Sequence, residues 1–213
     1  MPVDPALLAG YLGACVLLIL TPGPDMAFVL GQALAGGARR GWAATLGIMA
    51  GALCHVTAAA LGVAALVATH PALFTTLRLA GAAYLLWLGV QAIRSALAGG
   101  GGLVPKPGSA GGGLGPAFRQ GMLTNLLNPK VGLFFLAFVP QFVDPGRAAP
   151  GLQMLILGPL LPLLSLPFFA VLIAGAGRVA ARLRTGRAAR WLDGIAGTLF
   201  CGLGLRLLVG APK

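Results

Sequence analysis

Acidic side chains are almost absent from this sequence. Its 213 residues include 4 acidic residues against 15 lysines and arginines, and only 9% of the residues are charged. Hydrophobic residues make up 58% of the chain, and the mean hydropathy is +0.92. A soluble domain of this length has too little interior to bury so many apolar side chains. The composition therefore excludes a soluble globular protein.

Cysteine and histidine are also scarce. Cys15, Cys54 and Cys201 stand singly in apolar runs without a CxxC pair, and His55 and His70 are the only two histidines. This pattern offers neither a disulfide framework nor a cluster of metal ligands, so we expect no metal and no other cofactor. The HExxH and GxSxG motifs are missing too, which argues against a membrane-embedded hydrolase.

Long apolar runs are what the sequence has in abundance. Several are about 20 residues long, the length that a helix needs to cross a bilayer. The first run has no basic segment before it, and the rest of the chain is equally apolar, so we do not expect a signal peptide. The runs predict an all-α membrane protein with six transmembrane helices: Ala6–Leu34, Trp42–Thr69, Leu73–Ile93, Phe118–Val143, Leu152–Gly175 and Trp191–Val209.

A linker rich in glycine and proline divides the chain in two. Half of residues 99–116 are glycine, and the segment has neither a helical nor a strand period. Such a composition is typical of a flexible linker, and no Gly-Lys-Ser/Thr follows it to indicate a phosphate-binding loop. We therefore predict a three-helix unit over 1–97, a flexible cytoplasmic linker over 98–117 and a second three-helix unit over 118–213.

The two units resemble each other. "LTPGPDMAFVL" in the first span aligns with "LNPKVGLFFL" in the fourth, which places Pro22 on Pro129 and Phe28 on Phe135. The third and sixth spans share a looser pattern, "LAGAAYL" and "IAGTLFC". Because each unit has an odd number of spans, the copies must cross the membrane in opposite directions. This is the inverted repeat of secondary transporters.

The basic residues predict the orientation. Ten of them follow the first, third and fifth spans: Arg39, Arg40, Arg94, Lys106, Arg119, Arg178, Arg182, Arg184, Arg187 and Arg190. Arg78, Arg147 and Lys213 fall on the other side. The positive-inside rule then places these loops in the cytoplasm and both termini outside. The basic run 177–190 also suits anionic lipid headgroups, and no nucleic-acid partner is expected.

Prolines interrupt the first and fourth spans. Pro22, Pro24 and Pro129 lack the backbone donor that a helix interior needs. A membrane tolerates such gaps only where the backbone faces protein or a wet cavity. Thr21 and Asn128 precede these prolines as N-caps do. Both spans are therefore predicted to restart a helix inside the membrane, with N–H groups that suit a carboxylate.

Two charged residues lie at these restarts. Asp25 is in the first turn of one, where the helix dipole favours a carboxylate. Lys130 is in the first turn of the other, where the dipole disfavours a cation, so it requires an anion: Asp25 or the carboxylate of a ligand. A structural Asp–Lys pair and contacts with a transported molecule remain two open interpretations, and both can hold at once.

Other polar residues are expected to face the interior. His55, near the centre of the second span, is either a hydrogen-bonded core residue or a proton relay. Asn125 is either a packing residue or a ligand contact, because an unpaired amide in lipid is costly. Gly47 and Gly51 form a small-xxx-small face for close helix packing.

These residues carry a family resemblance. The segments "LTPGPDMAFVLGQALAGGARRGWAATLGIMAG" and "FRQGMLTNLLNPKVGLFFLAFVPQFV" resemble the LysE/RhtB family of bacterial amino-acid exporters. The resemblance covers nearly the whole chain except the linker. Its signature positions here are Pro22, Gly23, Pro24, Asp25, Asn125, Asn128, Pro129 and Lys130.

The resemblance implies a protein of the bacterial inner membrane that exports amino acids or close derivatives. It further implies that the proton gradient drives export and that a homodimer is possible, because members of the family are often dimeric. We hypothesise a site near the membrane midplane, where the substrate carboxylate faces a half-helix N-terminus and Lys130, and the ammonium faces Asp25. A proton entering through Asp25 or His55 would weaken one contact while the two halves rock.

The sequence fits two other kinds of carrier less well. A thiol or electron carrier of the DsbD/CcdA kind needs one cysteine in each of the first and fourth spans, and only Cys15 is present. A metal-ion exporter would need more acids and thiols along the spans than this chain has.

The first of these alternatives is testable with a cysteine-free variant. Replacing Cys15, Cys54 and Cys201 together should leave amino-acid export unchanged, because none of them has a predicted disulfide partner. Efflux of amino acids from loaded cells measures this. Loss of efflux in a cysteine-free variant that still reaches the membrane would favour the thiol carrier.

Overall fold

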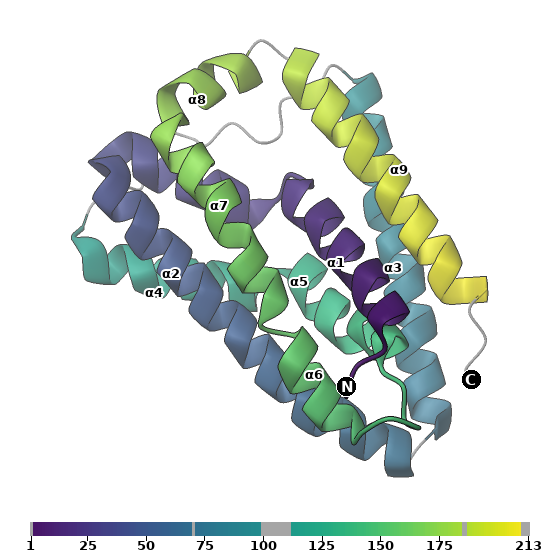
Figure 1. Ribbon diagram of the computed structural model, residues 1–213. Coiled ribbons are helices and arrows are strands. Elements are labelled where there is room, and N and C mark those ends of the chain that lie inside the picture. The colour runs from purple at the N-terminus through teal and green to yellow at the C-terminus, as the bar shows by residue number, and fades with distance from the viewer. Residues whose placement is uncertain (1, 70, 99–111, 185–186, 210–213) are drawn as a thin grey trace.

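A computed structural model describes residues 2–69, 71–98, 112–184 and 187–209, and all regular structure in these segments is helical (Figure 1). The predicted linker lies mostly outside the described residues. The elements are α1 (Pro5–Leu20), α2 (Pro24–Thr69), α3 (Pro71–Leu97), α4 (Leu114–Leu126), α5 (Pro129–Leu133), a π-helical turn η1 (Phe134–Phe138), a 3-10 turn η2 (Val139–Phe142), α6 (Pro150–Leu157), α7 (Leu160–Ala174), α8 (Ala176–Arg184) and α9 (Arg187–Val209).

Two helical stretches are long and apolar enough to cross a membrane by themselves, Pro24–Gly62 and Pro150–Ala174. A third is the pair Leu114–Leu126 and Pro129–Phe142, which is bent by 52° at its break. Within the described residues, α1 is a shorter apolar helix. The all-α class and the membrane character are thus confirmed, whereas the arrangement of six spans in two repeats stays a prediction.

The predicted loop between the first two spans was too wide. Helix α2 runs through it and departs from helical geometry only at Gly36 and Gly37. Gly37 has φ +71°, a left-handed conformation that glycine adopts without steric cost, so two residues suffice for the turn. Across this kink, Arg40 donates a hydrogen bond to the buried Gln32 side chain at 2.7 Å.

Helices α2 and α4 pack together through glycines. A Cβ atom at Gly47 would collide with the backbone of Phe118 and Met122 on α4, and one at Gly51 would meet Asn125. From the other side, Gly121 faces the backbone of Ala44 just as closely. The close-packing role predicted for Gly47 and Gly51 is confirmed, because any side chain there would push the two helices apart.

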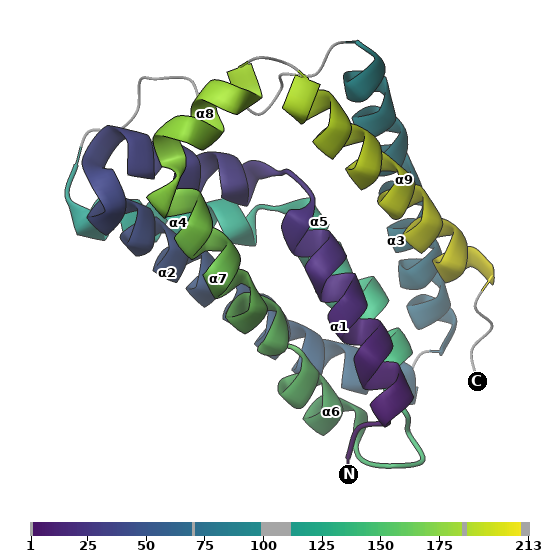
Figure 2. The ribbon, with the colours of Figure 1, turned by 45° about the horizontal axis from the view of Figure 1, so that its top comes forward.

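Helices α3 and α9 form a second close pair and run side by side in Figures 1 and 2. Here Gly89 of α3 and Gly197 of α9 each face the carbonyl oxygen of the other. Buried Asp193 of α9 accepts a hydrogen bond from the Ser95 hydroxyl at 2.7 Å. This pair lies along one side of α1 in both views.

Helix α1 lies between this pair and α7 (Figure 2). Tyr11, fully buried, packs against Phe134 and Phe142, with ring centroids 6.0 and 5.5 Å apart. Phe138 continues this cluster at 5.1 Å from Phe142. The aromatic turn of η1 and η2 therefore holds α1 against the second half of the chain.

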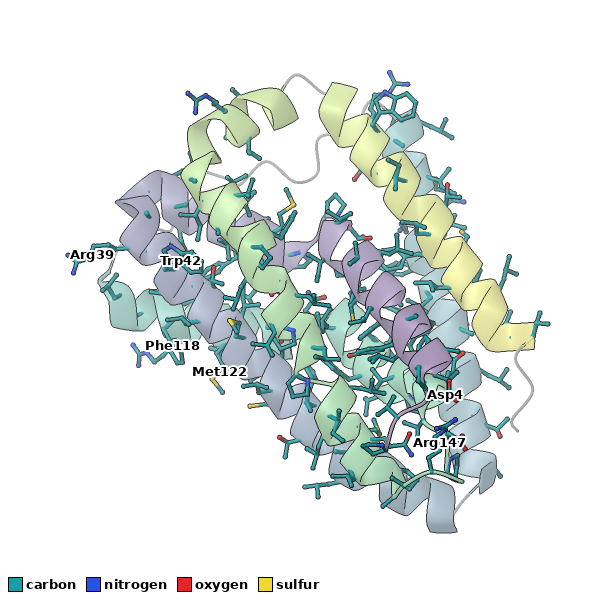
Figure 3. All side chains as sticks on the ribbon, in the orientation of Figure 1. Asp4, Arg39, Trp42, Phe118, Met122 and Arg147 are labelled. Carbon is teal, nitrogen blue, oxygen red and sulfur yellow. The ribbon has the colours of Figure 1, made fainter. Side chains whose placement is uncertain are left out.

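An ion-pair cluster ties down the start of α1. Asp4 caps the helix by accepting hydrogen bonds from the N–H groups of Ala6 and Leu7, and Arg147 lies 2.6 Å from its carboxylate. Arg147 also pairs with Asp144 at 3.3 Å. The two backbone donors, with Arg147, lower the pKa of Asp4. Figure 3 shows Asp4 and Arg147 together, far from Arg39.

The packing of α2 on α4 yields a stability prediction. Gly47→Ala should destabilise the protein by about 1–3 kcal/mol, because the new methyl group has no space beside Phe118. Gly62→Ala in the same helix is the matched control, since nothing lies within 4 Å of its Cβ position. That control should be neutral or stabilising by up to about 1 kcal/mol. Thermal unfolding in detergent measures both, and equal effects would contradict the predicted close contact.

Candidate functional site

The first break lies between α1 and α2, as predicted. Helix α1 ends at Leu20 and α2 begins at Pro24. Thr21, however, is not the N-cap of the second helix. It is the C-cap of the first, because both its N–H and its hydroxyl donate to the carbonyl of Leu17, at 3.1 and 2.7 Å. The N-cap position belongs to Gly23, whose carbonyl accepts the first α2 hydrogen bond from Ala27.

The second break lies between α4 and α5 and has the predicted cap. Asn128 accepts a hydrogen bond from the N–H of Lys130 at 3.1 Å through its side-chain oxygen, and Pro129 is the first helical residue. Asn128 is also 2% exposed. The predicted N-cap is therefore confirmed at Asn128 and wrong at Thr21. After Thr21 there are two prolines, Pro22 and Pro24, and the helix starts only at the second of them.

The two breaks contact each other. Asn125, at the end of α4, donates a hydrogen bond from Nδ2 to Oδ2 of Asp25 at the start of α2, at 2.8 Å. Lys130, at the start of α5, donates from Nζ to the carbonyls of Thr21 at 3.0 Å and Leu18 at 3.4 Å, at the end of α1. Each interrupted helix of one half is therefore bonded to the interrupted helix of the other.

Lys130 obtains its compensation from α1. Among the described residues the ion pairs are those of Arg147, and Asp25 and Lys130 form none with each other. The ammonium instead occupies the C-terminal end of α1, where the helix dipole is negative. The expectation that Lys130 requires an anion was incomplete, because backbone carbonyls also stabilise a cation. Gly23 leaves the necessary room, since a Cβ there would be 3.0 Å from Nζ.

Several buried polar atoms at the breaks lack a partner. They are Oδ1 of Asp25, Oδ1 of Asn125 and Nδ2 of Asn128. Buried polar atoms are nearly always hydrogen-bonded, so unpaired ones call for an explanation. Asp25 and Asn125 together offer two oxygen acceptors, which is the chemistry that binds an ammonium group.

These two residues line a cavity of about 60 Å³. Its polar lining is Thr21, Asp25, Asn125, Lys130 and Ser165. Its apolar lining is Leu18, Ile19, Met26, Ile48, Met49, Ala52, Val131, Leu161, Pro162, Phe168 and Phe169. A few polar groups at one place in an otherwise apolar lining are the chemistry of a small-molecule site. Ligand pockets are usually about 300 Å³ or larger, so this cavity must widen to admit an amino acid.

Sequence reasoning missed the contribution of α7. Leu161, Pro162, Ser165, Phe168 and Phe169 line the cavity from this helix, and the Ser165 hydroxyl donates to the carbonyl of Pro162 at 2.7 Å. The available signal was a serine in an apolar run interrupted by prolines. In the first and fourth spans, prolines preceded by a threonine or an asparagine had indicated the breaks.

His55 lies beside the site but does not line the cavity. Its Nε2 is 3.2 Å from the backbone carbonyl of Asn125, and its ring stacks on Phe135 at 6.3 Å. A carbonyl can only accept, so this hydrogen bond requires a proton on Nε2. His55 is thus connected to Asp25 through Asn125, while its role in proton transfer stays a prediction.

No group of three metal-ligating side chains occurs in the described segments, and the three cysteines are all free. Cys15 is buried on α1, whereas Cys54 is exposed on α2. The chemistry of the site is therefore that of a carboxylate, an ammonium and amides in an apolar enclosure.

Known proteins match this chain over most of its length. The family described as LysE type translocator matches residues 16–211. An uncharacterized membrane protein of Pseudomonas aeruginosa is 39% identical, and leucine efflux proteins of Enterobacter sp. (strain 638) and Klebsiella pneumoniae are 33% and 32% identical. Each alignment covers 92% of this chain and 92% of the relative. No solved structure matches.

The geometry predicts that exchanging the two charges fails. In the double variant Asp25→Lys with Lys130→Asp, the new carboxylate would face the carbonyls of Leu18 and Thr21, and the new ammonium would lie at a helix N-terminus. We expect transport to stay at background in the double variant and in both single variants, with the protein still in the membrane. Efflux and immunoblots of membranes measure this. Rescue in the double variant would instead indicate a simple ion pair.

Proposed function

Because this chain belongs to the family of LysE type translocators, we propose that it is a secondary exporter of amino acids in the bacterial inner membrane. One observation carries the proposal. Two unpaired oxygen acceptors, Oδ1 of Asp25 and Oδ1 of Asn125, are buried at the edge of an apolar cavity between the two broken spans. An amino acid supplies the ammonium that these atoms lack.

The zwitterion would lie between the breaks. Its ammonium would bind the two free oxygens of Asp25 and Asn125. Its carboxylate would face the first turn of α2, where N–H groups have no partner inside the helix. Lys130 lines the same cavity, with its ammonium bonded to the carbonyl of Thr21 at the end of α1.

The substrate side chain would be apolar. Methionines and aliphatic residues of α2, together with Phe168 and Phe169 of α7, line the cavity. A charged or strongly polar side chain would lose its hydration there without a partner, at a cost of several kcal/mol. Two of the similar proteins are leucine efflux proteins, which supports leucine and comparable neutral amino acids as substrates.

Export would proceed by alternating access of two inverted three-helix units, driven by protons. The basic loops would lie in the cytoplasm and both termini outside. The large separation of Arg39 from Asp4 and Arg147 in Figure 3 supports this orientation. The basic helix α8 would meet anionic headgroups, and two copies would form a homodimer in the lipid.

A growth-inhibition screen tests the substrate class. Expression in a sensitive strain should raise tolerance to leucine, other branched-chain amino acids and their toxic analogues, and leave tolerance to lysine and arginine unchanged. Direct efflux of labelled leucine from loaded cells is the second measurement. Protection only against a charged amino acid would contradict the proposed side-chain specificity.

Asp25 is the most sensitive position for this function. Asp25→Asn should lower leucine efflux at least about 30-fold, because a neutral amide cannot compensate the substrate ammonium in a buried site. Asp144→Asn removes an equivalent charge from an exposed loop and should retain efflux. Membrane levels of both variants must equal that of the unmodified protein. Full efflux by Asp25→Asn would remove the ammonium role.

A further inference from the structure

We propose that Lys130 is the group that couples export to protons, by competing with the substrate ammonium for the site. In its charged form it is a tethered cation that occupies the end of α1; in its neutral form it allows the substrate to bind. The inference deepens the proposed function and rests on it. It differs from the expectation that Asp25 or His55 carries the proton.

The contacts of Lys130 resemble those of a bound cation. Its ammonium is held by two backbone carbonyls, those of Thr21 and Leu18, at 3.0 and 3.4 Å. Both belong to the last turn of a helix from the other half of the chain. No described carboxylate lies within ion-pair distance of it, so its direct contacts are with backbone dipoles.

This environment makes the charge depend on conformation. Lys130 is the second residue of α5, and the N-terminus of a helix disfavours a cation. The C-terminus of α1, where the ammonium lies, favours a cation. If α1 moved away from α5, the ammonium would lose its favourable interaction with the end of α1 and keep its unfavourable interaction with the start of α5. Alternating access involves such a movement of one half against the other. The proton would therefore be released in one arrangement and bound again in the next.

The other ionisable groups near the cavity suit this task less well. Asp25 lies at the start of α2, accepts a hydrogen bond from Asn125 and is the proposed partner of the substrate ammonium, a role that requires a carboxylate. His55 packs on α5 at Gly132, but its Nε2 reaches only a backbone carbonyl. The residues that line the cavity from α1, α4 and α7 have no ionisable side chain. Asp25 and Lys130 are the two charges that a substrate meets there.

The cycle balances one proton against one substrate molecule. On the cytoplasmic side, the Lys130 ammonium gives its proton to water and becomes an amine, and the ammonium of the entering amino acid takes the position beside Asp25. On the outer side, hydronium protonates the amine, which returns to the carbonyls of α1. Repulsion between the two ammonium groups then expels the substrate. One amino acid leaves and one proton enters per cycle.

The test uses purified full-length protein in liposomes and labelled leucine. For the unmodified protein, proton competition predicts that the apparent dissociation constant falls by up to about tenfold per unit rise in pH, and that an imposed pH gradient drives accumulation. For Lys130→Met, leucine exchange should continue at a changed rate. Its apparent affinity should be independent of pH, and the pH gradient should have no effect.

Two further variants keep the result interpretable. Arg147→Met removes an exposed charge from the ion-pair cluster at the start of α1 and should retain the pH dependence. Lys130→Arg keeps a permanent charge, so it should bind leucine at no pH while remaining folded by thermal unfolding. If Lys130→Met does not fold, leucine binding by Lys130→Arg tests the inference instead.

Three outcomes have distinct meanings. Gradient-driven accumulation by Lys130→Met or Lys130→Arg would overturn the inference. A folded Lys130→Met that binds no leucine at any pH would also overturn it, and would make Lys130 a ligand of the substrate carboxylate. Failure of the unmodified protein to transport any amino acid would instead refute the proposed function.

Discussion

The structure depends on one constraint: a helix interrupted inside a membrane must find hydrogen-bond partners within the protein. Hydrocarbon offers none, and each unsatisfied backbone group costs several kcal/mol. Here the two interruptions solve the problem for each other. Lys130 of the second half binds the carbonyls that end α1, and Asn125 of the second half binds the carboxylate that begins α2. The breaks therefore have to lie side by side.

This mutual satisfaction also positions the cavity. Because the contacts cross between halves, any relative movement of the halves changes the partners of Asp25 and Lys130 together. The glycine contacts of Gly47, Gly51 and Gly121 bring the backbones of α2 and α4 close enough for Asn125 to reach Asp25. A binding site and the moving interface of a transporter can thus be the same surface, which is what coupling between substrate and conformation requires.

Local rules predicted the parts of the site that local chemistry decides. Both proline breaks, the Asn128 cap, the place of Asp25 in a first turn and the glycine face of α2 followed from residue types and spacing. Thr21 was assigned to the wrong helix end, because an N-cap and a C-cap hydroxyl have the same sequence context when two prolines follow closely.

The contacts between distant segments were beyond such rules. Nothing in the sequence near Lys130 indicates that its partners are the carbonyls of Leu18 and Thr21, since a backbone carbonyl has no signature in the residue type. The α7 wall was missed for the same reason. Its lining residues are ordinary apolar side chains, and only the packing of α7 on α1 and α2 turns them toward Asp25.

The charges of the cavity bear on how a membrane potential would act. In the proposed cycle, the charges of Asp25 and Lys130 sum to zero when Lys130 is charged and no substrate is bound, so the empty carrier would return without moving net charge. With Lys130 neutral and a zwitterion bound, the site carries the single negative charge of Asp25. An interior-negative potential favours moving that charge outward, by about 2.3 kcal/mol per 100 mV if it crosses the whole field. In this scheme the potential and the pH gradient both favour export. The loaded site moves outward with the negative charge of Asp25, because Lys130 has given up the proton that would neutralise it.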